Sequence, residues 1–295
     1  MKFSNLNINA IKIKDQNISK IYSGNDIIYS TESLSQRLLD VYNGSVGAYS
    51  LKQLNSSYSG PIIQVRRSSD NQEYNFYAND LTNGNLISWV NNSTGFISRW
   101  YDQSGNNNHA TQSTANLQPR IVSGNSVTNS NSILSPYYEY TQNGFLLPNI
   151  SSSNNLISVC CFTNHPISNV TQDYVRIGNA QWVVRHDGSS TVGQLHCYFR
   201  TDTTLKTNFR LNNQVVNNSW SFFVTTWDGS TARAYKNGSS IGSNSPGGSL
   251  TPDSSTGYIG STSDSLSGYI SDILVFHRVL SSADISNIYN NYIIG

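Results

Sequence analysis

Residues 100–110 gather most of the side chains in this chain that could do chemistry. Their sequence, WYDQSGNNNHA, holds two aromatic rings, a carboxylate, a glycine, several amides and a histidine. Asparagine beside glycine favours a tight turn with positive φ, and such a turn presents side chains to a ligand. We therefore predict that Tyr101, Asp102, Asn108 and His109 bind a ligand. The alternative, which we favour for His109, is that Asp102 and His109 hold the loop together through hydrogen bonds.

Together with two upstream segments, this stretch resembles the start of the α-L-arabinofuranosidase B catalytic domain. The upstream segments are Gly47–Leu51 and Ser56–Gly60, followed by Gln64–Asp70. The family carries a small-residue start, an S-S-[FY]-[ST]-G turn, a basic-Ser-Asp strand end and then Y-D-Q-S-G-x-x-N-H. The resemblance runs from about Gly47 to Gln112. It implies a β-sandwich, although kinship of fold does not fix function.

The C-terminal third resembles the end of a laminin-G-like, concanavalin-type jelly roll. Trp220–Gly229 matches a family strand, and Asn237-Gly238 is a strong hairpin signal. Gly268–Phe276 matches the closing strand, and its imperfect alternation indicates burial on much of both faces. This resemblance covers about Leu156 to Tyr292, and the two resemblances agree on one sandwich.

A retaining arabinofuranosidase needs two carboxyl groups about 5–5.5 Å apart. The resemblance places the nucleophilic Glu at the end of a G-N-A-E segment, but here Gly178–Gln181 ends in an amide, which cannot attack as a carboxylate does. The family's acid/base Asp points to Asp264, which follows Tyr258–Gly260. We therefore predict no catalytic residues and no enzymatic activity. Trp182 and Asp264 would join the loop residues in weak sugar binding.

No other catalytic set is visible. The five histidines show no H-x-x-x-H spacing and no phosphate-binding loop occurs, so we predict neither a metal nor a cofactor. Cys160 and Cys161 are adjacent, so in a strand they point to opposite faces. We favour free buried thiols. The alternative, a vicinal disulfide, comes from the Cys-Cys-Phe of the arabinofuranosidase family.

Composition excludes several classes of partner. The 295 residues are 12% charged, with a formal net charge of +1, so no basic stripe exists for nucleic acid. No run of about 18 apolar residues exists, so we predict no membrane insertion. Residues 1–30 lack the apolar core of a signal peptide. The surface rich in serine, threonine and asparagine is typical of extracellular or virion β-proteins, although an AT-rich genome would explain the asparagines equally well.

The predicted fold is all-β: an antiparallel concanavalin-like jelly-roll sandwich over residues 31–295, with a few short helices. Turn signals recur about every 8–12 residues, as in sandwiches. Residues 1–30 read as a separate small β-module because isoleucines alternate around two polar turns. Ile18–Gly24 resembles N-terminal segments of bacteriophage structural proteins. The alternative is a hairpin folded onto the sandwich.

These features predict a non-enzymatic bacteriophage virion protein at the particle surface, made in the host cytoplasm. It would contact other virion proteins through residues 1–30 and display the sandwich to a host surface glycan, while self-association into a homo-oligomer is left open. The first alternative is a glycoside hydrolase of arabinofuranosidase type. The second is an architectural decoration protein without a ligand.

Overall fold

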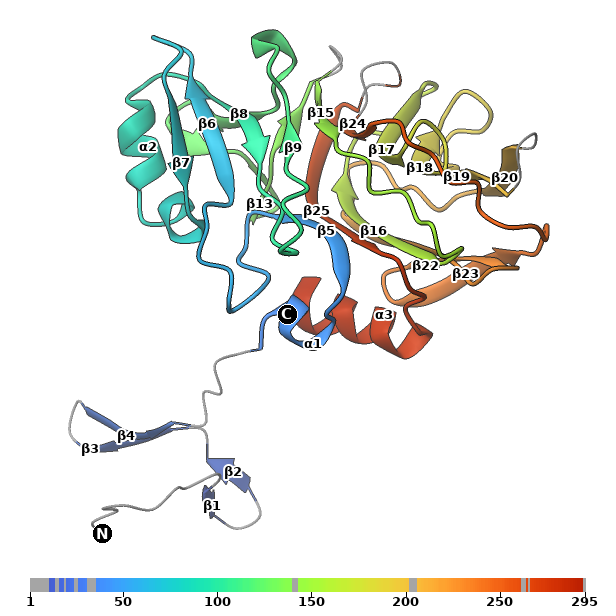
Figure 1. Ribbon diagram of the computed structural model, residues 1–295. Helices are drawn as coiled ribbons and strands as arrows, with labels where there is room; N and C mark the ends of the chain where they lie inside the picture. The colour runs from blue at the N-terminus through green and yellow to red at the C-terminus, as the bar shows by residue number, and fades with distance from the viewer. Residues whose placement is uncertain are drawn as a thin grey trace. The chain divides into compact units, whose positions relative to one another are not determined.

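Figure 1 shows the computed structural model of the protein. The structure describes residues 11–13, 16–18, 20–23, 26–30, 36–139, 143–201, 206–260, 264 and 266–293. The chain forms two compact units, Met1–Arg37 and Leu38–Gly295. The domain boundary at residue 30 stays a prediction.

The N-terminal unit contains two short antiparallel hairpins. Strand β1 (Ile11–Ile13) pairs with β2 (Gln16–Ile18), and β3 (Lys20–Ser23) pairs with β4 (Asp26–Ser30). Within the described residues, each strand pairs only with its hairpin partner. Two-stranded hairpins are marginally stable by themselves, and within the described residues the second edge of each strand pairs with no other strand.

The larger unit is an antiparallel sandwich. Its first sheet has this strand order: β23 (Ser239–Asn244), β22 (Ala232–Lys236), β21 (Ser221–Trp227), β16 (Ile157–Asn164), β25 (Gly268–Phe276) and β5 (Ser45–Ser50). The second sheet begins with β20 (Lys206–Leu211), β19 (Leu195–Arg200), β18 (Trp182–Asp187), β17 (Thr171–Ile177), β24 (Gly257–Gly260) and β15 (Gly144–Leu147).

The second sheet then continues through the N-terminal part of the sandwich. Its further strands are β9 (Ala110–Thr111), β8 (Gly95–Trp100), β6 (Ile63–Arg67) and β7 (Glu73–Phe76). Short strands connect it to β25: β10 (Arg120–Ser123), β11 (Ser126–Val127) and β14 (Tyr137–Tyr138). A small hairpin joins β12 (Asn129–Ser130) to β13 (Ile133–Leu134).

Helical segments are few and short. They are α1 (Leu38–Val41), α2 (Asn85–Val90) and α3 (Ser282–Ile288), the 3₁₀ turns η1 (Ala78–Leu81) and η2 (Ala115–Leu117), and the π-helical turn η3 (Tyr289–Ile293). The predicted all-β sandwich with a few short helices is confirmed. In the part of the chain that is described, no helix has the length and apolar character needed to span a membrane.

The main core lies between the two sheets. Three fully buried tryptophans, Trp100, Trp182 and Trp227, form its largest side chains. A second core lies between the other face of the first sheet and the helices α1 and α3, which Figure 1 shows on the same side of the molecule. The central strands β16, β21 and β25 are buried on both faces, and their sequences are largely apolar, as expected for strands covered on both sides.

Strand β16 shows this two-sided burial clearly. Cys161 points into the core between the sheets, and its neighbour Cys160 points toward the helices. Both thiols are free, as is Cys197. Burial raises the pKa of all three, so they behave as small apolar side chains.

Candidate functional site

Within the loop of residues 100–110, Asp102 is buried and holds the loop to β5. Its Oδ1 accepts hydrogen bonds from the backbone nitrogens of Ala48 and Ser104, both at 2.9 Å, and its Oδ2 accepts one from the backbone nitrogen of Asn108 at 3.0 Å. The Asn108 amide donates to the carbonyl of Val46 at 2.7 Å. The structure therefore gives Asp102 and Asn108 internal partners that join the loop to a core strand.

Tyr101 and His109 are also engaged within the protein. The mostly buried Tyr101 donates its hydroxyl hydrogen to Asn75 Oδ1 at 2.9 Å, and its ring meets the His109 ring edge-on at 4.9 Å. His109 Nδ1 accepts from the backbone nitrogen of Asp102 at 3.1 Å. Burial lowers the pKa of His109, so this imidazole is uncharged near pH 7. These contacts fit the structural role that we favoured for His109.

Trp182 lies in the core between the sheets. Its side chain is fully buried, its indole nitrogen donates to Thr225 Oγ1 at 2.9 Å, and its ring stacks on Phe199 at 4.5 Å. Trp182 therefore exposes no surface on which a sugar could stack.

Gln181 is equally enclosed. Its Nε2 donates to the carbonyls of Ser152 at 2.7 Å and Thr251 at 3.1 Å, and its Oε1 accepts from the Ser152 nitrogen at 2.6 Å. The amide fits this site because it donates twice and accepts once. A carboxylate would face two carbonyl oxygens there.

The structure instead brings charged side chains together on the outer face of β17, β18 and β19. These residues point away from the core and form the polar face: Asp173, Arg176, Arg185, Asp187, His196 and Tyr198, with Arg210 of β20 and with Asp264, which follows β24. Asp264 is the only one of the six predicted ligand residues that lies there.

Asp264 stands between two arginines. Its Oδ2 lies 3.4 Å from Arg176 Nη2 and 3.4 Å from Arg185 Nη1, and its side chain is 34% exposed. Its backbone carbonyl accepts from the Asp173 nitrogen at 2.9 Å, which fixes the loop after β24 beside β17. A carboxylate that solvent reaches is thus held between two cations.

The buried Asp173 also forms ion pairs with Arg176 and Arg185. Its Oδ2 lies 2.6 Å from Arg176 Nη2, and because that nitrogen is also 3.4 Å from Asp264, the two carboxylate oxygens lie within about 6 Å of each other. Burial raises the pKa of Asp173, and this effect outweighs the opposing pull of Arg176 and Arg185. Among the described residues, Asp173 Oδ1 has no hydrogen-bond partner, although Arg185 Nη1 is 3.6 Å away.

The polar face continues toward β20 through His196. Its Nδ1 accepts from Arg185 Nε at 3.3 Å and lies 3.1 Å from Asp187 Oδ2, which Arg210 approaches at 3.3 Å. Burial, followed by the charges of Arg185 and Arg210, lowers the pKa of His196 to about 4. The ring is therefore neutral near pH 7. The Arg185 guanidinium also lies 4.7 Å over the ring of Tyr198.

Strand register separates Gln181 from Asp264. Asp264 contacts Asp173, and Asp173 pairs with Arg185 on β18, whereas Gln181 directly precedes β18. Arg185 follows Gln181 by four residue steps, which corresponds to about 13 Å at roughly 3.3 Å per residue. Gln181 and Asp264 are thus too far apart to form a retaining pair of carboxyl groups, even if residue 181 were Glu.

Sequence reasoning missed the arginines, Asp173 and the His196–Tyr198 pair. A sequence pattern with a period of two could have indicated this face. Along β18, Arg185 and Asp187 alternate with the buried Val184 and His186. Charged residues at alternate positions of a strand that is otherwise apolar indicate one polar face. In the described residues, no group of three or more His, Cys, Asp or Glu side chains is arranged to hold a metal ion.

Two family models match separate parts of the chain. Residues 140–286 match the model of the concanavalin A-like lectin/glucanases superfamily, and residues 40–135 match that of the alpha-L-arabinofuranosidase B catalytic domain. The fold is concanavalin-like. No curated protein sequence matches the chain.

Solved structures of GH54 α-L-arabinofuranosidases share this fold. One, soaked with a cyclic sulfate inhibitor, is 15% identical with a TM-score of 0.60. Another, complexed with arabinofuranosyl-α-1,2-xylobiose, is 14% identical with a TM-score of 0.59. Each match covers 84% of this chain but only 62% of the arabinofuranosidase chain. Identity this low shows a shared fold alone.

The prediction that the chain is not an enzyme is wrong. The arabinofuranosidase catalytic-domain model, which is the model of an enzyme family, matches residues 40–135. That prediction took Gln181 as the lost partner of Asp264, but the register places these two residues apart. Nothing in the comparisons links the chain to bacteriophage structural proteins.

Proposed function

We propose that this protein is a glycoside hydrolase of arabinofuranosidase type, and that its substrate binds on the polar face of β17–β19. The observation that carries the proposal is the pair Asp173 and Asp264, whose carboxylate oxygens lie within about 6 Å of each other beside Arg176. This spacing is compatible with the two carboxyl groups of a retaining glycosidase, about 5–5.5 Å apart. The family-model match over residues 40–135 supports the choice of reaction.

The two carboxyl groups have different surroundings, as an acid and a base require. Asp264 is 34% exposed and meets the substrate directly. The Asp173 side chain has no exposed surface, its pKa is raised, and its Oδ1 has no hydrogen-bond partner among the described residues, so neighbouring side chains must move before this oxygen meets a hydroxyl group or water. A raised pKa suits a group that holds a proton before the reaction.

The arginines suit a sugar ligand. The side chains of Arg176 and Arg185 are 15% and 17% exposed, and the nearby carboxylates hold them in place. Guanidinium groups donate to sugar hydroxyl oxygens, and the Asp264 carboxylate accepts from sugar hydroxyl groups. Because these charges neutralise one another, the face offers fixed donors and acceptors without a strong net charge.

The test is hydrolysis of 4-nitrophenyl α-L-arabinofuranoside by the full chain. We expect nitrophenol release by the unchanged protein and a decrease in kcat of at least about 100-fold in Asp264→Asn. The matched control is Asp228→Asn, because Asp228 is also paired with an arginine, Arg233, and its side chain is 27% exposed, but it lies on the β21–β22 hairpin. The control should keep its activity.

Two results would overturn the proposal. One is the absence of nitrophenol release by a folded, unchanged chain. The other is full activity in Asp264→Asn. Thermal unfolding of each variant shows whether it is folded, so a loss of activity can be assigned to the carboxyl group.

A second proposal concerns residues 1–30. We propose that this segment attaches the sandwich to another protein, such as a bacteriophage virion protein, by strand pairing through the edges of β1–β4. The separate N-terminal unit and its hairpins support attachment, and the bacteriophage setting comes from the Ile18–Gly24 pattern. Deleting residues 1–30 should leave a folded sandwich that no longer joins particles. Normal incorporation of the truncated chain would refute this.

A further inference from the structure

A groove in the N-terminal part of the sandwich lies apart from the polar face. It consists of two hollows that share Tyr77. The larger hollow, of about 620 Å³, lies between β7, η1 and α2, and the smaller, of about 200 Å³, lies beside the turn at Tyr58–Gly60. Figure 1 shows β7 and α2 at the opposite end of the sandwich from β18–β20. We call these two hollows the tyrosine groove.

The tyrosine groove holds aromatic rings that solvent reaches. Tyr74 is 57% exposed and Tyr77 is 49% exposed, and within the described residues they are the only large aromatic side chains with such exposure. Because the other large rings among the described residues are at least partly buried, two open rings beside one hollow make a surface suited to a ligand.

The ring of Tyr74 is held from behind. It packs against Phe76 at 5.3 Å and Trp89 at 6.0 Å, and these two rings contact each other at 5.4 Å. The Arg67 guanidinium lies 4.8 Å over the Trp89 ring and donates to the Trp89 carbonyl at 2.6 Å. Tyr74 thus stands on a rigid aromatic base, which lowers the entropic cost of ordering a ligand on it.

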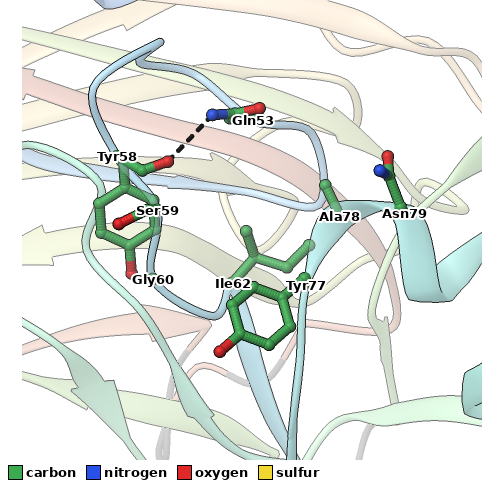
Figure 2. Close-up of a pocket in the computed structure, with 8 residues that line it drawn as sticks. All are labelled: Gln53, Tyr58, Ser59, Gly60, Ile62, Tyr77, Ala78 and Asn79. Carbon is green, nitrogen blue, oxygen red and sulfur yellow. Dashed lines mark hydrogen bonds between the residues drawn. The ribbon is translucent and has the colours of Figure 1, made fainter.

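The smaller hollow lies beside the turn at Tyr58–Gly60, which hydrogen bonds hold in place. Figure 2 shows the rings of Tyr58 and Tyr77 on either side of it, with Ile62 beside Tyr77. The Tyr58 hydroxyl donates to the Pro61 carbonyl at 2.6 Å, and Gln53 Nε2 donates to the Tyr58 carbonyl at 2.9 Å. Burial raises the pKa of Tyr58 to about 12, so its hydroxyl stays a donor.

Polar groups of fixed orientation border the rings. Asp80 accepts from the Tyr77 nitrogen at 2.9 Å and from the Asn85 amide at 2.7 Å, and a carboxylate with about four acceptor sites keeps capacity for more. The Asn75 amide is oriented by the hydroxyl of Tyr101 at 2.9 Å. Tyr101, predicted to bind a ligand, therefore acts here as a positioning residue.

The charge of the tyrosine groove narrows the class of ligand. The residues that line it include one acid, Asp80, and no lysine, arginine or histidine. This lining offers no cation to a phosphate or a uronic acid. It offers ring faces for apolar C–H groups, together with amides and a carboxylate for hydroxyl groups, which matches a neutral sugar ring.

We propose that the tyrosine groove binds a neutral oligosaccharide chain, stacked on Tyr74 and Tyr77 and hydrogen-bonded by Asn75, Asp80 and Asn85. The larger hollow, about 620 Å³, falls within the roughly 300–1,000 Å³ range of small-molecule sites. This binding site is independent of the proposed hydrolytic site on the polar face.

The test is affinity electrophoresis of the full chain in native gels. The gels contain soluble arabinoxylan, linear arabinan or mixed-linkage β-glucan, with polygalacturonate as the anionic control. We expect retardation by at least one neutral polysaccharide. Tyr74→Ala and Tyr77→Ala should each lower the association constant about tenfold, because each removes a stacking face. Tyr74→Phe should keep binding, since the ring remains, and Val216→Ala should change nothing, because Val216 is exposed but outside the groove.

Three outcomes would overturn the inference. The first is equal migration of the full chain in every gel. The second is unchanged retardation of folded Tyr74→Ala and Tyr77→Ala. The third is retardation by polygalacturonate alone, which would indicate binding by charge.

A double variant, Arg185→Gln with Asp264→Asn, separates the two sites. We expect it to keep the part of the retardation that Tyr74→Ala removes, even if the polar face also contributes to binding of arabinose-containing chains. If it instead abolishes retardation while Tyr74→Ala does not, binding belongs to the polar face, and the proposed function survives without the groove.

Discussion

Asp102 Oδ1 accepts a hydrogen bond from the backbone nitrogen of Ala48 at 2.9 Å, across 54 positions of the sequence. The same carboxylate serves two more backbone nitrogens and the Ser104 hydroxyl. We expect Asp102→Ala to lower the free energy of unfolding by about 3 kcal/mol or more, because buried donors would lose their acceptor. Urea unfolding measures this. Ser104→Ala, which removes one of these donors, should cost about 1 kcal/mol, and equal losses would contradict the prediction.

Replacing Gln181 by Glu should not create a better enzyme. The new carboxylate would face the carbonyls of Ser152 and Thr251 and would lie about 13 Å along the strand from the level of Asp264. We expect Gln181→Glu to leave nitrophenol release unchanged and to lower the free energy of unfolding by about 2 kcal/mol at pH 7. Gln214→Glu, at a half-exposed site, should cost little. Increased hydrolysis in Gln181→Glu would show that the register argument fails.

Lowering the pH should destabilise the sandwich, because the buried His165 is neutral in the folded protein. Its Nδ1 donates to the Pro166 carbonyl at 2.9 Å, and its Nε2 accepts from the Tyr174 hydroxyl at 2.7 Å, which is a neutral arrangement. Burial lowers the pKa of His165 to about 4, against about 6.5 in the unfolded chain.

The sign of the pH effect follows from these two values. As pH falls below about 6.5 the unfolded chain takes up a proton first, so His165 contributes a loss of about 2 kcal/mol between pH 7 and pH 5. The loss continues down to about pH 4. Urea unfolding at several pH values should show a smaller pH dependence in His165→Gln. Parallel curves for the two proteins would contradict this assignment.

Removing residues 1–30 should leave the thermal midpoint of the sandwich within about 2 °C of that of the full chain. Leu38–Gly295 form their own compact unit with two apolar cores, so their stability does not depend on the N-terminal hairpins. Calorimetry of both proteins checks this. A decrease of more than about 5 °C would show that the two units stabilise each other.

The sequence alone determined several turns and strands, because short-range backbone preferences and side-chain alternation decide them. Asn237 and Gly238 both have positive φ and connect β22 to β23, as the Asn-Gly hairpin signal predicts. Gly268–Phe276 forms β25, and its imperfect alternation reflects burial on both faces. A register shift between Phe162 and Thr163 in the pairing with β25 accounts for that irregularity.

Tertiary structure alone decided which side chains meet on the polar face. Asp173 and Arg176 are three residues apart, so in a regular strand they would point to opposite faces. The register of β17 against β18 shifts between Asp173 and Val175, and this bulge places both side chains outside. The loop after β24 then brings Asp264 to them across 91 positions of chain from Asp173, through a backbone hydrogen bond.

The same reasoning explains why Trp182 and Gln181 misled the sequence-based prediction. A motif records residue types but not the face of the sheet or the level along a strand at which a side chain lies. Trp182 points into the core, and Gln181 lies four residues from the level of Arg185. Strand register, which depends on packing between distant segments, sets both properties.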